Sequence, residues 1–220
     1  MNKHIFSVQK FLTLPVIGII RGLTLEETLG ILPYYVKAGF TTVEITMNTP
    51  NAEQMIREIV NQYEGVLNIG AGTVCTDKEL DLAIEAGAQF IVMPIINESV
   101  IKSCIKEKIP VFPGAYTATE IFQAWSLGAE MVKVFPASSL GPEYIKDLRG
   151  PLNQIKLVPV GGVNIDNCLD YMKAGASGLG MGSQLFDTKK IREKNWKELS
   201  NTLELFANKM KGFTEQVSLQ

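Results

Sequence analysis

The sequence predicts a (β/α)8 TIM barrel formed by residues 1–220 as a single domain, with an N-terminal capping helix. A buried-strand pattern followed by an amphipathic helix pattern occurs eight times, at intervals of roughly 20 to 26 residues, close to the unit size of a minimal barrel. No linker, low-complexity tract or change in composition divides the chain. An open doubly wound sheet is the alternative, but eight units without an antiparallel element favour the closed barrel.

The eight predicted strands are short runs rich in apolar residues and bounded by polar residues, glycine or proline. In chain order they are 16–21, 41–46, 67–72, 89–94, 109–114, 130–137, 155–162 and 177–182. Their nearly continuous apolar character is typical of parallel strands that are covered on both faces.

The predicted helices follow the strands and carry apolar residues at helical spacing. They are 25–38, 51–63, 77–87, 98–108, 117–128, 141–148, 164–175 and most of 188–211. Thr24 is predicted to cap the first of them, with Glu27 forming a capping box and Gly39 fitting the C-terminal end. Asp77 and Thr117 are predicted to cap two later helices.

A further helix is predicted over residues 2–13, ahead of the first strand. Its apolar residues Ile5, Val8, Phe11 and Leu12 have helical spacing. We expect this helix to cover the open bottom of the barrel with its apolar stripe.

The composition excludes several classes of function. The net charge is −2 and no block of like charge stands out, so neither nucleic acid nor a membrane surface is an expected partner. The longest apolar run, 16–20, is far too short for a membrane span, and the N-terminus lacks a signal-peptide core. Cys75, Cys104 and Cys168 show no C-x-x-C spacing, which indicates reduced thiols in a cytoplasmic protein.

His4 is the only histidine in the chain. One histidine cannot build a histidine-rich metal site, and a Ser-His-Asp triad is not expected. We expect no histidine-rich metal site within one chain, and no cofactor. Acid–base chemistry then falls to carboxylates, lysine, tyrosine or water.

Lys133 lies in the middle of the predicted buried strand EMVKVFPA. Burial disfavours the ammonium form and lowers the pKa of a lysine, and a free amine can attack a carbonyl carbon to form a Schiff base. The alternative is a lysine whose charge reaches solvent at the strand end. The remaining motifs favour the Schiff base.

Functional residues of such barrels lie at the C-terminal ends of the strands and in the loops that follow. Glu44 is in the middle of the second strand, where a buried carboxylate needs a partner such as Lys133 or Arg21. A structural ion pair is one interpretation. The other is a carboxylate that moves protons beside an amine nucleophile. This second interpretation explains why the charges are buried, because a buried ion pair is often no more stable than apolar residues in its place.

The loops after strands seven and eight carry Gly161, Gly162, Gly182 and Ser183. Glycine lets the backbone approach a ligand, and barrels of this class bind phosphate at these two loops. Ordinary turn glycines are the alternative, but two such loops at the two expected places favour a phosphate site. Arg21 adds a cation there, or it pairs with Glu44.

Three further residues at strand ends are candidates for contact with substrate. The Thr73 hydroxyl is a candidate for binding a carboxylate, and Phe135 is expected to pack against the apolar part of the substrate. Pro94 is included with them. The alternative is that this proline only terminates the pairing of its strand.

The chain resembles the 2-keto-3-deoxy-6-phosphogluconate aldolases, a group that includes the 4-hydroxy-2-oxoglutarate aldolases. The matching segments are PVIGIIRG, GFTTVEITMNTP, GAGTV, AGAQFIVMP, FPGAYTATE, VKVFPA, GPEYIKDLRGP, PVGGV and GMGS. The resemblance implies a metal-free, trimeric (β/α)8 aldolase. It further implies a Schiff-base role for Lys133, an acid–base role for Glu44, a pyruvyl-carboxylate contact for Thr73, and a phosphate site at Gly161, Gly162 and Ser183.

Two positions depart from the gluconate-type pattern. Asn48 stands where that pattern has arginine, and Val160 stands where it has the threonine of Thr-Gly-Gly. Both resemble the branch that acts on the galactonate epimer, and Val160 is counted among the substrate-binding residues for this reason.

The expected reaction is cleavage of a 2-keto-3-deoxy-6-phospho sugar acid, of the gluconate or galactonate epimer, to pyruvate and glyceraldehyde 3-phosphate. Cleavage of 4-hydroxy-2-oxoglutarate to pyruvate and glyoxylate is a further expectation. The enzyme would be a lyase and a homotrimer whose other partners are small molecules. The alternatives are another phosphate-binding barrel enzyme, such as an isomerase or synthase, and a catalytically silent barrel that binds a sugar-acid phosphate.

Overall fold

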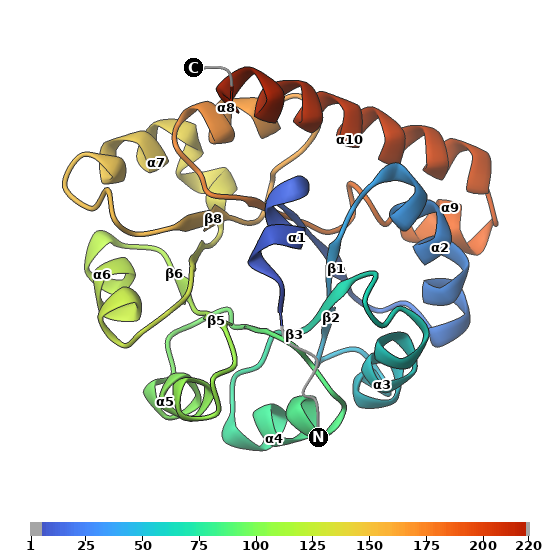
Figure 1. The fold of residues 1–220 in the computed structure, drawn as a ribbon, viewed down its shortest axis with the longest axis horizontal. Helices are drawn as coiled ribbons and strands as arrows, with labels where there is room; N and C mark the ends of the chain where they lie inside the picture. The colour runs from blue at the N-terminus through green and yellow to red at the C-terminus, as the bar shows by residue number, and fades with distance from the viewer. Residues whose placement is uncertain (1–5, 219–220) are drawn as a thin grey trace.

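The computed structural model describes residues 6–218 of the chain, and this part contains nine short strands (Figure 1). They are β1 Val16–Ile20, β2 Thr42–Thr46, β3 Asn68–Gly72, β4 Ile91–Val92, β5 Val111–Phe112, β6 Gly114–Ala115, β7 Val132–Val134, β8 Leu157–Pro159 and β9 Leu179–Met181. All of their pairings are parallel.

The strands form two sheets, in the orders β5-β4-β3-β2-β1-β9 and β6-β7-β8. β5 and β6 are the two halves of the predicted fifth strand, separated by Pro113, which has no N–H to donate. Because β5 pairs with β4 and β6 pairs with β7, this strand passes from one sheet to the other. A bridge between Val160 and Gly180 joins the other two edges. The predicted (β/α)8 barrel is confirmed.

The helices are α1 Val8–Thr13, α2 Leu25–Ala38, α3 Ala52–Gln62, α4 Asp77–Glu85, α5 Glu98–Lys106, α6 Ala118–Ser126, η1 Ala137–Ser139, α7 Gly141–Arg149, α8 Cys168–Lys173, α9 Thr188–Arg192 and α10 Trp196–Ser218. In Figure 1 the helices from α2 to α10 surround the strands. The predicted last helix is divided into α9 and α10, with Lys194 between them at φ 54°. Within residues 6–218, no helix is both long and apolar enough to cross a membrane.

Most of the predicted helix caps are confirmed. Thr24 caps α2 with the expected capping box, Gly39 ends α2 in the left-handed conformation, and Thr117 caps α6. The prediction of Asp77 as the cap of α4 is wrong by one residue, because the Thr76 hydroxyl accepts the N–H of Glu79. The Glu79 side chain bonds back to the Thr76 N–H, so a threonine with a glutamate three residues on forms the better cap.

The buried apolar residues fall into two clusters. The larger lies between strands and surrounding helices and includes Val43, Ile45, Val132 and Val134. The smaller contains Ile17, Phe90, Val92, Phe112, Val158 and Val160, whose side chains alternate with those of the larger cluster along the strands. Glu44 lies between Val43 and Ile45, and Lys133 lies between Val132 and Val134. Because these valines and the isoleucine belong to the larger cluster, the Glu44 and Lys133 side chains point to the interior side of the barrel.

The N-terminal segment contributes two aromatic side chains to the smaller cluster. The Phe6 ring lies 5.2 Å from the Phe90 ring, and Phe11 is fully buried. Val8 and Leu12 of the predicted stripe are exposed, and Ile5 lies outside the described residues. Helix α1 lies over the centre of the ring of strands in Figure 1. Covering of the barrel bottom by this helix remains a prediction.

Candidate active site

Lys133 and Glu44 are the two charged side chains at the centre of the site. Lys133 is in the middle of β7 and 3% exposed, and Glu44 is in the middle of β2 and 1% exposed. Both line one small cavity inside the barrel, together with apolar side chains that include Val92 and Val158. Since β2 and β7 belong to different sheets, only closure of the barrel brings these two groups to the same space.

Burial shifts both groups toward their neutral forms. It raises the pKa of the Glu44 carboxyl to about 6, although the positive charges of Lys133 and Arg21 oppose the rise. Burial also lowers the pKa of Lys133; the Glu44 charge opposes this shift and the Arg21 charge adds to it. The site therefore favours an unprotonated amine beside a carboxyl group that can exchange a proton near neutral pH.

The structure does not support the interpretation of a direct structural ion pair. Among the described residues, no salt bridge or hydrogen bond joins Glu44 to Lys133 or to Arg21. Instead, the Arg21 guanidinium donates to the Thr73 hydroxyl at 3.4 Å. The coupling of Glu44 to the two cations is therefore electrostatic and acts across a gap.

Gly72 provides the space for the Glu44 carboxylate. A Cβ atom at this position of β3 would overlap the carboxylate. Gly72 pairs with Thr46, which lies two residues after Glu44 on β2 and on the same face of the strand. The absence of a side chain at the end of β3 is therefore a packing requirement of the buried carboxylate.

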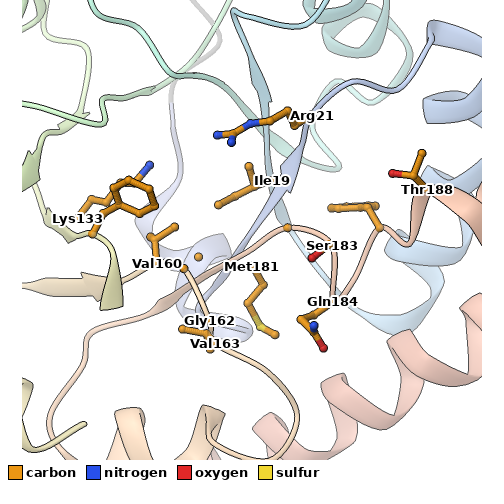
Figure 2. A pocket seen from close by; sticks show the side chains of 15 residues that line it. Ile19, Arg21, Lys133, Val160, Gly162, Val163, Met181, Ser183, Gln184 and Thr188 are labelled. Carbon is orange, nitrogen blue, oxygen red and sulfur yellow. The ribbon is translucent and has the colours of Figure 1, made fainter. Parts of the chain in front are cut away.

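A pocket of about 410 Å³, here called the central pocket, opens above Lys133. Figure 2 shows Arg21 and Lys133 extending toward one another across it. Five of the candidate site residues line it: Val160, Gly161, Gly162, Gly182 and Ser183. The sequence reasoning missed several other lining residues: Ile19, Val163, Gly180, Met181, Gln184, Phe186 and Thr188. Three of them adjoin predicted site residues in the chain, since Val163 follows Gly162, Met181 precedes Gly182 and Gln184 follows Ser183, and this proximity is the signal that could have pointed to them.

The two glycine-bearing loops have a backbone suited to binding an anion. Gly161 and Gly162 have φ angles of 91° and 80°, which glycine adopts without strain. The Asn167 side-chain amide donates to the Gly162 carbonyl at 3.0 Å, which holds this carbonyl. Within the part of the chain that the structure describes, the N–H groups of Gly161, Gly162 and Ser183 have no acceptor. These donors are available to a ligand.

Phe135 stands between the central pocket and a second one. Its ring lies 5.0 Å from the Lys133 nitrogen and is 38% exposed. The second pocket, here called the side pocket, has a volume of about 540 Å³ and is lined by Phe135 together with Pro94, Ile95, Gly114, Tyr116 and other residues. Pro94 thus lies in the wall of the side pocket and not in that of the central pocket. Thr73 reaches the site through its contact with Arg21.

The chain matches the model of the KDPG and KHG aldolase family over residues 8–202. It is 42% identical over 174 residues to the 2-dehydro-3-deoxy-6-phosphogalactonate aldolase of Escherichia coli K12, which covers 79% of this chain and 85% of that protein. The KHG/KDPG aldolase of the same strain is 32% identical over 168 residues, 76% of this chain and 78% of that protein.

Solved structures agree with this similarity. A native KDPGal structure is 36% identical, with a TM-score of 0.83 over 94% of this chain and 99% of that chain. The KDPG aldolase from Legionella pneumophila, with pyruvate captured as a covalent carbinolamine intermediate, is 28% identical, with a TM-score of 0.82 over 89% of this chain and 95% of that chain. On the family model and these relatives together, the chain belongs to the KDPG and KHG aldolase family.

Proposed function

We propose that this protein is a Schiff-base aldolase that cleaves a 2-keto-3-deoxy-6-phospho sugar acid to pyruvate and glyceraldehyde 3-phosphate. The observation that carries the proposal is the convergence of Lys133 and Glu44 on one buried cavity, with the pKa of the lysine lowered by burial. The covalent pyruvate adduct in the Legionella relative supports the same chemistry.

Lys133 performs the covalent step. Its free amine attacks the C2 carbonyl carbon, and loss of water from the carbinolamine leaves an iminium ion. Glu44 accepts the proton of the C4 hydroxyl as the C3–C4 bond breaks, and the bonding electrons move through C3 and C2 to the iminium nitrogen. The aldehyde leaves and an enamine remains. Protonation at C3 followed by addition of water releases pyruvate and restores the amine.

The two ends of the substrate carry negative charges that the pocket can hold. Arg21 and Thr73 bind the carboxylate of the keto acid, because the guanidinium contacts the Thr73 hydroxyl and lines the same pocket as Lys133. The unpaired amides of Gly161 and Gly162, with Gly182 and Ser183 in the wall of this pocket, bind the phosphate. Holding both ends fixes C2 against the amine.

The galactonate epimer is the proposed preferred substrate. Val160 lines the central pocket and offers no hydroxyl to a substrate, and the 42% identical relative is a 2-dehydro-3-deoxy-6-phosphogalactonate aldolase. A smaller activity on 4-hydroxy-2-oxoglutarate is consistent with the same imine chemistry.

Borohydride reduction in the presence of pyruvate tests the mechanism. An imine at Lys133 is reduced to a stable secondary amine, which mass spectrometry locates on the peptide that contains this residue. We expect the adduct in the wild type and its absence in Lys133→Arg. A folded wild-type protein that cleaves substrate but gives no adduct would indicate an isomerase-like or synthase-like mechanism instead.

We also propose that the chain acts as a cytoplasmic single-domain homotrimer. A designed cube-shaped protein cage built by fusing symmetric oligomeric domains is 36% identical to this chain, with a TM-score of 0.86 over 94% of this chain and 75% of that chain. Four apolar side chains are exposed here: Ile95 and Tyr116 line the side pocket, and Phe122 and Trp125 lie on α6 with ring centroids 5.6 Å apart. This apolar face is suited to contact a second copy of the chain.

Light scattering after size exclusion tests the assembly. Phe122→Ser, on the apolar face, is expected to yield smaller species, whereas the control Leu205→Ser, an exposed leucine on α10, is expected to leave the wild-type mass unchanged. Equal masses for all three proteins would place the contact elsewhere.

A further inference from the structure

Two buried threonine hydroxyls connect the loop after β1 to the loop after β2. The Gly22 N–H donates to the Thr49 hydroxyl oxygen at 3.0 Å, and the Thr49 and Thr46 hydroxyls lie 3.0 Å apart in a hydrogen bond. Thr46 is fully buried and Thr49 is 3% exposed, so the bond between the two hydroxyls is shielded from water, whereas the bond from the exposed Gly22 is part-buried. The mechanism proposed above uses neither hydroxyl.

The hydrogen bond to Thr49 fixes the backbone directly after Arg21. The Gly22 N–H belongs to the peptide plane that follows the Arg21 Cα, so holding this N–H sets the ψ angle of Arg21. Gly22 itself has a φ of 68°, and outside its two chain neighbours no atom lies within 4 Å of the place where its Cβ would be. No side chain packs at this position, so the Thr49 hydroxyl provides a specific polar contact to the turn.

The other end of the connection is anchored in the barrel wall. Thr46 is the last residue of β2, on the same face as Glu44, and it pairs in register with Gly72, the residue before Thr73. The hydrogen bonds from Gly22 through Thr49 to Thr46 therefore connect the backbone next to Arg21 to β2, the strand that carries Glu44. The Arg21 guanidinium in turn contacts Thr73, which follows the partner of Thr46 in β3.

We propose that Thr49 is a positioning residue that holds Arg21 against the carboxylate of the bound keto acid. The inference rests on the proposed function, in which Arg21 binds that carboxylate. Thr49 touches no substrate atom in this proposal. It acts through Arg21, and its removal should weaken binding of the acid more than it slows the chemistry.

The test measures pyruvate affinity and steady-state cleavage for Thr49→Val, which keeps the shape of the side chain and removes its hydroxyl. Loss of the acceptor of the Gly22 N–H and of the partner of the buried Thr46 hydroxyl is expected to raise KM and the pyruvate Kd by about tenfold, with kcat within about twofold of the wild type. Thr49→Ser restores the hydroxyl and should restore both constants. The matched control is Thr28→Val, because the fully buried Thr28 hydroxyl has no hydrogen-bond partner within the described residues.

A double-mutant cycle separates positioning from general damage. If Thr49 acts through Arg21, Thr49→Val should have no further effect on KM in an Arg21→Ala background. Equal effects in both backgrounds, a KM matching that of Thr28→Val, or failure of Thr49→Ser to restore KM would each overturn the inference. Failure of the proposed function is distinct, because it is the absence of the borohydride-trapped pyruvate adduct in the wild type.

Discussion

Glu44→Gln should gain stability relative to the wild type as the pH rises through about 6, while it removes most of the activity. The Glu44 carboxyl is 1% exposed, and burial raises its pKa from 4.5 to about 6. A carboxyl group whose pKa is raised by folding contributes stability that is fully present below its unfolded value. This contribution is lost as the pH rises through about 6, because the ionised form is the one that burial disfavours.

The magnitude follows from the two pKa values. The difference between 4.5 and about 6 corresponds to about 2 kcal/mol at 1.36 kcal/mol per pH unit. Glutamine does not titrate and does not lose this contribution. The free energy of unfolding of the variant, relative to that of the wild type, should therefore increase by about 2 kcal/mol between pH 4 and pH 8. Turnover at neutral pH should fall by roughly 10²- to 10⁴-fold, because the amide cannot accept a proton.

Urea unfolding at several pH values and one fixed protein concentration measures the stability difference, since linear extrapolation compares the two proteins under identical conditions. Glu58→Gln, which removes an exposed carboxylate from α3, is the control for the loss of one charge. A difference between Glu44→Gln and wild type that stays constant from pH 4 to pH 8 would refute the argument that burial perturbs this carboxyl group.

Three other predictions concern the same pocket. Lys133→Arg should fold and lose turnover, because arginine stays protonated and cannot act as the amine; a rate within about tenfold of wild type, a barrier change of only ~1.4 kcal/mol, would argue strongly against the imine. Val160→Thr should raise the gluconate-to-galactonate ratio of kcat/KM by roughly 5- to 150-fold, and an unchanged ratio would show that this side chain does not read the epimer. Gly72→Ala should displace the Glu44 carboxylate and lower kcat while imine trapping persists, whereas Gly212→Ala, which meets open space, should leave kcat unchanged; equal rates would contradict the packing argument.

The order of the barrel elements could be predicted because each strand–helix unit has its own local pattern. What failed was the detail that depends on neighbouring chain segments. The fifth strand divides at Pro113 because its two halves pair with different partners, β4 and β7. The cap of α4 is Thr76 and not Asp77, because the competition between adjacent polar residues is decided by which of them completes a capping box.

The site was predictable to the extent that it follows from topology. Side chains alternate between the two faces of a strand, so Lys133 and Glu44, each between two apolar residues of a strand in a closed barrel, are expected to point to the same interior. The roles of Gln184 and Thr188 in the pocket wall depend on the path of the loop after β9. The contact between Gly22 and Thr49 depends on two loop conformations at once, and no local pattern encodes it.

The seam between β8 and β9 has a consequence for the range of substrate lengths that the barrel accommodates. In the described part of the chain, β8 and β9 are joined by one parallel bridge between Val160 and Gly180. The Ser177 N–H also donates a hydrogen bond to the Leu157 carbonyl. The two glycine-bearing loops extend from this seam, one on each side. A small displacement of one loop relative to the other therefore disturbs few interstrand hydrogen bonds, while the densely paired wall of β1, β2 and β3 keeps the carboxylate end fixed. Adjustment at this seam therefore acts on the end of the pocket where a phosphorylated and a shorter keto acid differ.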